Sequence, residues 1–354
     1  MHPNSVNWVI HIITLMLMTT PSKKIQLSAG KMQCLKALSN ESGILTALAM
    51  DQRGSLRKTI EGLLGRSMQD DELIAFKSAV SRALSPYASA ILLDPQFGGA
   101  ALKSRAANCG AILSYEQSGY DTVHKGRMLS LPPTLSVQRL VDQGAQGIKV
   151  MVYYDPDDSA EINDPKHALI ERVGAECKAA DVIFFLEPYT YTDDIPDEKS
   201  IAYAKVKPHK VMGTMRDFSE PRFGVDVLKV EVPVIMKYVD GSSAHTAGSP
   251  YAHTRSQAIT AFQQAAAVTN LPFIYLSAGV SDSVFRETMQ LAIESGVPFS
   301  GVLCGRATWQ DGIPDFVKSG AEGFYRWLSD VGVQRIQALN AVLSKATSWQ
   351  TRVG

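Results

Sequence analysis

The sequence predicts a single (β/α)8 barrel, in which eight parallel strands alternate with the helices that surround them. Three observations carry this prediction. The chain has 354 residues, it alternates short apolar runs with helix-like stretches from about residue 40, and these runs number eight. Eight such units in roughly 300 residues match the usual size of this barrel. A doubly wound sheet is the alternative, but it rarely needs eight strands, and no GxGxxG or phosphate-loop motif follows any run.

Each apolar run is short and ends in a polar or glycine-rich turn, as expected of a strand that is buried on both faces. The predicted strands are 44–50, 88–93, 111–115, 147–153, 182–186, 225–230, 272–277 and 300–304. Helices are predicted where apolar positions recur every three or four residues among charges. The clearest are 70–84, 166–180, 256–269, 282–295, 315–330 and 334–346. Long loops at 155–165, 188–200 and 234–256 follow strands, which in a barrel places them on the catalytic face.

We expect one barrel domain over residues 31–354, preceded by an N-terminal extension over residues 1–30. The apolar run 8–18 is shorter than the roughly 20 residues that span a bilayer. It also lacks the preceding basic residues of a signal peptide. The sequence therefore predicts that Met18 is the native start, with an amphiphilic membrane anchor as the alternative.

Charge and cysteine content exclude several partners and compartments. Lys plus Arg and Asp plus Glu number 35 each, so no overall field would hold the protein on nucleic acid or on an anionic membrane. The four cysteines are scattered and form no CxxC pair. This pattern favours free thiols and a cytoplasmic protein.

Ionisable residues recur at the ends of the predicted strands, where a strand between helices should be apolar. They are Asp51, Asp94, Glu116, Lys149, Glu187, Lys229, Glu231 and Arg306. In a barrel the side chains of a strand alternate between the axis and the helices. Lys229 and Glu231 are therefore expected on one face, and if Val230 and Val232 meet the helices, the two charges point to the barrel axis.

An enclosed lysine is disfavoured in its charged form, so its amine can attack a ketone near neutral pH. Lys229 and Lys149 are the two candidates inside strand-like sequence, and Glu187 or Glu231 is the candidate carboxylate for each. A Schiff base also needs proton transfers, which an enclosed carboxylate can perform. A lysine and a glutamate together thus supply the nucleophile and the proton-transfer group that imine chemistry needs.

The ends of the last two strands have the composition of an anion site. Ser277 and Gly279 lie in the first segment, 276–280, and Gly305 and Arg306 lie in the second, 303–308. Small residues let backbone amides approach an anion, and arginine supplies a fork of donors. The loops after strands seven and eight of such barrels commonly hold phosphate, which predicts a phosphorylated substrate.

These segments together resemble the class I tagatose 1,6-bisphosphate aldolases of lactose and galactose catabolism, and the resemblance extends from about residue 30 to the C-terminus. The matching segments are Ala47-Leu-Ala-Met-Asp-Gln-Arg-Gly54, Leu92-Leu-Asp-Pro95, Ser114-Tyr-Glu-Gln-Ser-Gly-Tyr-Asp121, Phe184-Phe-Leu-Glu187, Tyr203-Ala-Lys-Val-Lys-Pro208, Asp226-Val-Leu-Lys-Val-Glu-Val-Pro233, Tyr275-Leu-Ser-Ala-Gly-Val280 and Gly301-Val-Leu-Cys-Gly-Arg-Ala-Thr-Trp309. The resemblance implies a barrel that cleaves a ketohexose bisphosphate to dihydroxyacetone phosphate and glyceraldehyde 3-phosphate, without a metal or another cofactor.

The resemblance also implies a role for each matching residue. Lys229 corresponds to the Schiff-base lysine and Glu187 to its proton shuttle. Lys149, Asp51 and Gln52 correspond to the polar cluster around the reacting carbons and hydroxyls, with Lys149 cationic. The phosphate grip corresponds to Ser277, Gly279, Gly305 and Arg306. A homodimer or homotetramer is the expected assembly for a metabolic barrel.

Three other interpretations remain at this stage. A metal-dependent aldolase would need histidines at strand ends, whereas His245 and His253, which share a loop, follow no apolar run directly. An imine-forming aldolase for 6-deoxy-6-sulfofructose 1-phosphate would have the same lysine and glutamate. The stretch 241–253 is more polar than the family pattern and leaves the distal substituent open. A non-catalytic sugar-phosphate sensor would be expected to lack the lysine or the glutamate.

Overall fold

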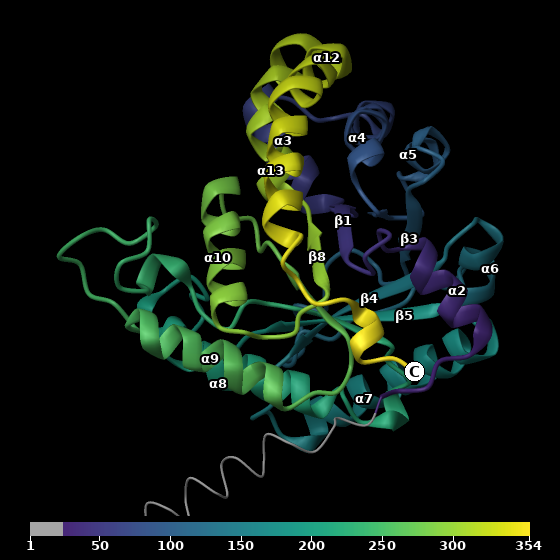
Figure 1. Cartoon of the computed structure of the whole chain (residues 1–354). Helices are drawn as coiled ribbons and strands as arrows, with labels where there is room; N and C mark the ends of the chain where they lie inside the picture. The colour runs from purple at the N-terminus through teal and green to yellow at the C-terminus, as the bar shows by residue number, and fades with distance from the viewer. Residues whose placement is uncertain (1–23) are drawn as a thin grey trace, which may run out of the picture.

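The computed structural model describes residues 24–354, and within this range eight parallel strands close into a barrel in chain order. Helices surround the strands, and the chain ends beside the first helix, α2 (Figure 1). The prediction of a (β/α)8 barrel is confirmed. The strands are β1 (Leu45–Met50), β2 (Ala90–Leu93), β3 (Gly110–Ser114), β4 (Gly147–Tyr154), β5 (Ile183–Thr190), β6 (Val227–Val230), β7 (Phe273–Leu276) and β8 (Gly301–Cys304).

The strand pairs differ in how far their ladders extend. β4 and β5 pair along their whole length, from Gly147 opposite Ile183 to Tyr154 opposite Thr190. The neighbouring β5–β6 ladder is short and ends at Leu186 opposite Leu228. The pairing of β5 with β6 therefore stops before Glu187 and Lys229, the next residues of the two strands.

The helices of the described chain are α2 (Ala29–Ala37), α3 (Gly54–Leu64), α4 (Asp70–Leu84), α5 (Gly99–Ser104), α6 (Val137–Asp142), α7 (Ala160–Ala179), α8 (Ile201–Asp217), α9 (Arg255–Ala267), α10 (Asp282–Glu294), α11 (Arg306–Trp309), α12 (Ile313–Trp327) and α13 (Val333–Leu343). Local signals explain several starts. Thr254 and Gln257 form a reciprocal capping box at α9, which satisfies backbone N–H groups that the first turn leaves free.

Helix α7 begins earlier than the predicted residue 166. Its N-cap is Ser159, and Pro165 lies inside the helix. The Asn163 side chain donates hydrogen bonds to the carbonyls of Asp155 and Asp158, which ties the first turn to the preceding loop. Pro165 is the sixth residue of α7, so the helix continues through a proline that the sequence-based boundary treated as its limit.

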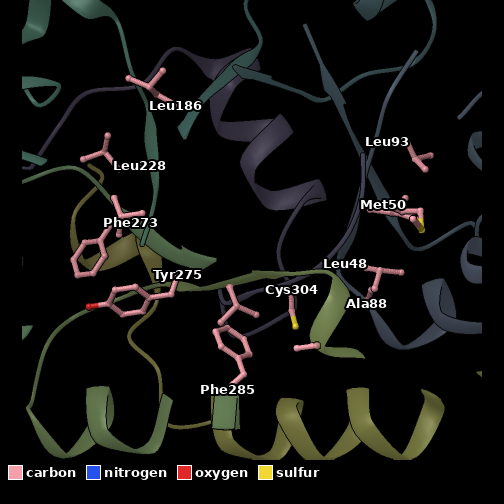
Figure 2. Packing of buried hydrophobic residues seen from close by; sticks show 14 of the residues in the cluster. Leu48, Met50, Ala88, Leu93, Leu186, Leu228, Phe273, Tyr275, Phe285 and Cys304 are labelled. Atoms are coloured by element: carbon pink, nitrogen blue, oxygen red, sulfur yellow. The ribbon is translucent and has the colours of Figure 1, made fainter. Parts of the chain in front are cut away.

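The buried apolar residues form two clusters, one outside the strands and one inside the barrel. Outward side chains of the strands pack against the helices, and Figure 2 shows part of this cluster, with Leu228 of β6, Tyr275 of β7 and Phe285 of α10. A second cluster fills the amino-terminal half of the interior. There Leu35 and Leu38, at the end of α2, pack against inward residues of the strands. Polar chemistry is thereby confined to the carboxyl-terminal half.

Most of the expected extension 1–30 lies outside the described residues, including the apolar run 8–18 and Met18. Of the rest, Ile25 forms a parallel bridge with Val353, and Ser28 caps α2. The domain boundary at residue 31 stays a prediction. Among residues 24–354, no helix combines the length and apolar character needed to cross a bilayer.

Candidate active site

The centre of the carboxyl-terminal half is Lys149, whose ammonium group is buried among three carboxylates. Its Nζ lies 2.7 Å from Asp51 Oδ2, 2.6 Å from Glu116 Oε1 and 3.2 Å from Glu187 Oε2. Burial alone would lower the pKa of Lys149, but the charges of Asp51, Glu116 and Glu187 outweigh it and raise the pKa well above its ordinary value. The direction of this shift agrees with a cationic Lys149, which stays a prediction.

The second lysine, Lys229, pairs with the same glutamate. Its Nζ lies 2.7 Å from Glu187 Oε1, and both side chains are buried. Glu187 therefore stands between two lysines, with one oxygen toward each. Its Oε2 accepts no hydrogen bond from the described residues, since the contact with Lys149 has the distance but not the geometry of one. That oxygen has free acceptor capacity inside the barrel.

Asp51 is held ionised by the lysines around it. Burial would raise the pKa of Asp51, but the positive charges of Lys149 and Lys229 outweigh burial and lower the pKa far below its usual range. Asp51 follows β1 and reaches Lys149 across the top of the barrel. The structure thus brings together four predicted residues, Lys229, Glu187, Lys149 and Asp51.

The sequence motifs contained two further members of this cluster that were given no role. Glu116 follows β3, and its Oε2 accepts a hydrogen bond from the backbone N–H of Met151 at 3.2 Å. Arg53 donates to the carbonyl of Glu116 at 2.8 Å and lies 3.8 Å from its Oε1. Glu116 was among the ionisable residues at the ends of predicted strands, whereas nothing in the local pattern around Arg53 indicated its partner.

A buried lysine outside the barrel wall fixes the segment that carries Asp51. Lys77 of α4 donates hydrogen bonds to the carbonyls of Met50 and Gln52, both at 2.8 Å. It also forms an ion pair of 2.6 Å with Asp94 at the end of β2. Because the carbonyls on both sides of Asp51 are held in this way, its side chain is directed toward Lys149.

The predicted phosphate grip forms one small cradle at the ends of β7 and β8. Gly279 has φ +75°, a backbone conformation that favours glycine, and a Cβ there would lie 2.8 Å from Cζ of Arg306 and would displace the guanidinium group. A Cβ on Gly305 would lie 3.0 Å from the carbonyl oxygen of Ala49 and 3.3 Å from Nε2 of Gln52. Ser277 is buried at the start of the same turn. Arg306 is exposed and forms no ion pair within the described chain.

Gln52 connects the two halves of the site. It adjoins Asp51 in the chain, and its side-chain amide lies beside Gly305 of the cradle. Its Oε1 is buried and accepts no hydrogen bond from residues 24–354. A buried amide oxygen without a donor is costly, and a hydroxyl group of a bound ligand would satisfy it.

Two other groups considered from the sequence, Glu231 and the pair His245 and His253, lie apart from this cluster. Of the two candidate carboxylates, Glu187 contacts the site lysines, whereas the carboxylate of Glu231 pairs with Lys207 of α8 at 2.7 Å. His245 and His253 do not converge, since their rings contact the carbonyls of Lys237 and Ala204 respectively. Nowhere in the described chain do three His, Cys, Asp or Glu side chains form a group that could hold a metal ion.

An aromatic wall that the sequence did not indicate borders the cluster. Tyr153 lies four residues beyond Lys149 on β4, hence on the same face of the strand. The guanidinium group of Arg127 lies 5.5 Å from the centroid of the Tyr153 ring and 4.4 Å from that of Tyr191. Arg127 also pairs with Glu198. Burial raises the pKa of Tyr153 to about 12, so its hydroxyl stays protonated at neutral pH.

Comparison with known proteins identifies the family. A family model described as DeoC/LacD family aldolase matches residues 45–311. A tagatose 1,6-diphosphate aldolase of Listeria monocytogenes is 46% identical over 331 residues, which cover 93% of this chain and 96% of that protein. The chain belongs to the DeoC/LacD family of aldolases. Tagatose 1,6-diphosphate aldolases of Enterococcus faecalis and Streptococcus mutans are also 46% identical and are covered over 98% and 99% of their lengths.

Solved structures of other aldolases share the fold. A fructose-bisphosphate aldolase from Plasmodium falciparum superposes with a TM-score of 0.64 at 13% identity, over 94% of this chain and 98% of that one. A Schiff-base-forming fructose-1,6-bisphosphate aldolase superposes with a TM-score of 0.54 at 14% identity, over 88% and 98%. At this identity the likeness concerns the barrel alone. Membership of the DeoC/LacD family makes this protein an aldolase, that is, a lyase.

Proposed function

We propose that this aldolase cleaves tagatose 1,6-bisphosphate to dihydroxyacetone phosphate and glyceraldehyde 3-phosphate through a Schiff base on Lys229. The observation that carries the proposal is the 2.7 Å contact between Lys229 Nζ and Glu187 Oε1 in a buried site that also holds cationic Lys149. The names of the relatives support the substrate, since three bacterial relatives are called tagatose 1,6-diphosphate aldolases.

The first half of the reaction makes the imine. A proton passes from the Lys229 ammonium to Glu187, and the resulting neutral amine attacks the C2 ketone of the substrate. Glu187 then returns a proton to the carbinolamine hydroxyl, which leaves as water. Lys149 keeps its charge throughout, because the three carboxylates around it raise its pKa. The product of this half is an iminium ion at C2.

The second half breaks the carbon–carbon bond. The C4 hydroxyl gives its proton to Glu187, its oxygen forms the aldehyde carbonyl, and the electrons of the C3–C4 bond move to the iminium nitrogen. Glu187 then returns this proton to C3 of the enamine, and addition of water to the imine carbon releases dihydroxyacetone phosphate and free Lys229. The Gly279–Arg306 cradle holds one phosphate, and that remote binding energy keeps the reacting bond in position.

Trapping the imine tests the proposed chemistry. Incubation with dihydroxyacetone phosphate and borohydride should add one reduced adduct, which peptide mapping should locate on Lys229. An adduct on Lys149, or no adduct, would overturn the mechanism. A coupled assay that detects both triose phosphates would show cleavage directly. Competition between tagatose 1,6-bisphosphate and 6-deoxy-6-sulfofructose 1-phosphate would show whether the distal group is phosphate or sulfonate.

The biological setting is part of the same proposal. We assign the enzyme to the cytoplasm and to lactose and galactose catabolism, as a homodimer or homotetramer. The four cysteines, all free thiols, support a reducing compartment. Light scattering on the purified protein would determine the assembly.

A further inference from the structure

The proposed reacting pair lies just beyond the end of the β5–β6 ladder. The β5–β6 ladder ends at Leu186 opposite Leu228, so Glu187 and Lys229 are the next residues on each strand and lie beyond the last pair of the ladder. β5 itself stays paired with β4 up to Thr190. The ladder thus fixes Glu187 relative to Lys149 on β4, but it does not extend to the contact between Glu187 and Lys229.

A carboxylate joins the two strands beyond the ladder. Glu231, two residues after Lys229, has its Oε2 2.7 Å from the backbone nitrogen of Thr190 and 2.5 Å from the Thr190 hydroxyl oxygen, and both groups donate to it. Its Oε1 pairs with Lys207 at 2.7 Å. Tyr203, from α8, donates to the Thr190 hydroxyl at 2.8 Å. All four residues are buried.

These contacts replace the missing strand ladder. The Glu231 carboxylate satisfies the N–H of Thr190 that a longer β6 could have paired, and Lys207 compensates its buried charge. Buried charge-assisted hydrogen bonds are short and hold their partners in one geometry. Glu231 contacts neither Lys229 nor Lys149 within ion-pair distance in the described structure. Any effect it has on the lysines therefore passes through the backbone.

We propose that Glu231 is a positioning residue, whose bridge from β6 to Thr190 of β5 holds the Lys229 amine within proton-transfer reach of Glu187. The inference rests on the proposed Schiff-base chemistry. Without the bridge, the four-residue strand β6 could move away from β5, and the distance between Nζ and Oε1 would vary. A displacement of about 1 Å can lower a rate by about 10²-fold.

The same strand pair supplies a matched control at its other end. Asp226, which precedes β6, accepts a hydrogen bond from the backbone N–H of Phe184 on β5 at 2.8 Å and pairs with Lys31 at 2.7 Å. It is thus a second buried carboxylate that joins a backbone N–H of β5 to a lysine, but it lies away from the reacting pair. Asp226→Asn should weaken the fold without moving Lys229 relative to Glu187.

The experiment compares Glu231→Gln with Asp226→Asn in the full chain. For Glu231→Gln we expect kcat and the single-turnover rate of imine trapping to fall by about 10- to 100-fold, with KM within about threefold of the wild type. The pH profile of kcat should shift as well, because proton transfer between Lys229 and Glu187 is altered. Asp226→Asn should keep the wild-type kcat and pH profile, even at an equal loss of thermal stability.

Each outcome decides one point. If the wild type yields no adduct on Lys229, the proposed function fails, and the inference with it. If the wild type is trapped but Glu231→Gln matches Asp226→Asn in kcat and pH profile, only the inference is overturned. If Glu231→Gln does not fold, Thr190→Val provides the second test. It removes the hydroxyl that donates to Glu231, but it keeps the hydrogen bond from the Thr190 backbone N–H and the ion pair between Lys207 and Glu231. It should lower kcat by several-fold, and an unchanged kcat would contradict the inference.

Discussion

The carboxylate of Glu187 and the amine of Lys229 lie 2.7 Å apart inside the barrel, on neighbouring strands that are no longer paired at that level. The other oxygen of Glu187 lies 3.2 Å from Lys149. One glutamate thus contacts a lysine proposed to react and a lysine that stays charged. Replacing members of this arrangement one at a time separates their contributions.

Replacing Glu187 with glutamine should remove proton transfer but keep the shape of the site. We expect kcat to fall by about 10²- to 10⁴-fold, the usual contribution of a general acid–base group, with a much smaller change in KM. Steady-state kinetics with a coupled assay measures both constants. A Glu187→Gln enzyme with more than a tenth of the wild-type kcat would show that another group carries the proton.

Replacing Lys149 with methionine should destabilise the protein. The substitution leaves Asp51, Glu116 and Glu187 buried without their shared cation, and an uncompensated buried charge typically costs about 3–5 kcal/mol. Urea unfolding measures the loss. The double variant Lys149→Met/Glu116→Gln should recover part of it, because one excess carboxylate is removed. Equal stability of the single and double variants would contradict this electrostatic explanation.

Replacing Gly279 with alanine should weaken phosphate binding. A Cβ there would displace Arg306, whose Cζ would lie 2.8 Å away, and would strain a backbone at φ +75°. Gly65, at the end of α3, is the matched control, because it has φ +66° but no atom within 4 Å of the position that a Cβ would take. Both alanine variants should lose about 1–2 kcal/mol of stability through backbone strain. Only Gly279→Ala should raise KM, by about tenfold or more, and equal KM values would refute the cradle.

Lys166 of α7 should make stability depend on pH. It is fully buried and donates to the Tyr191 hydroxyl at 3.2 Å. Burial lowers the pKa of Lys166 from 10.5 to about 8. Between these values the unfolded chain binds more protons than the folded one, so this residue makes the free energy of unfolding rise as the pH rises. Below about pH 8 its full destabilising effect is present.

Comparison with Lys166→Met isolates this effect. The difference in unfolding free energy, wild type minus variant, should increase between about pH 8 and 10.5, by at most about 3 kcal/mol. Lys58→Met, which removes an exposed lysine of α3, provides the baseline for general alkaline effects. A difference that stays flat across this window would contradict the prediction.

Removing divalent metals should leave cleavage intact. The proposed imine accepts the electrons of the breaking bond, so no cation is needed for that purpose. We expect full activity after exhaustive treatment with a chelator and dialysis, measured as the release of both triose phosphates. Loss of activity that zinc restores would favour the metal-dependent alternative.

The barrel could be predicted from the sequence because parallel strands covered on both sides are almost uniformly apolar. The run 147–153 became β4 (Gly147–Tyr154), and 300–304 became β8 (Gly301–Cys304). Residues Lys149 and Glu187 stood out because they interrupt such runs. The short helices α5 and α6 are six residues each, which is too few to show a helical period.

Partners that come from other parts of the chain could not be predicted. Strand alternation would place Glu231 on the barrel axis if Val230 and Val232 met the helices, but β6 ends at Val230, so the alternation does not extend to residue 231. Its partner, Lys207, lies on a helix with no pattern that would indicate the contact. Likewise Lys77 reaches the segment around Asp51 from α4. Such pairings depend on how the helices dock, which local periodicity does not specify.

Leu35 and Leu38 close the amino-terminal end of the barrel, and this closure affects the order of product release. Because apolar side chains fill that end, substrate and products reach and leave Lys229 from the carboxyl-terminal end of the barrel. In the proposed reaction, glyceraldehyde 3-phosphate departs by this route while the three-carbon remainder is still bound to the enzyme as an enamine. Water then reaches the imine by the same route, so the proposal predicts that the ketone product leaves second.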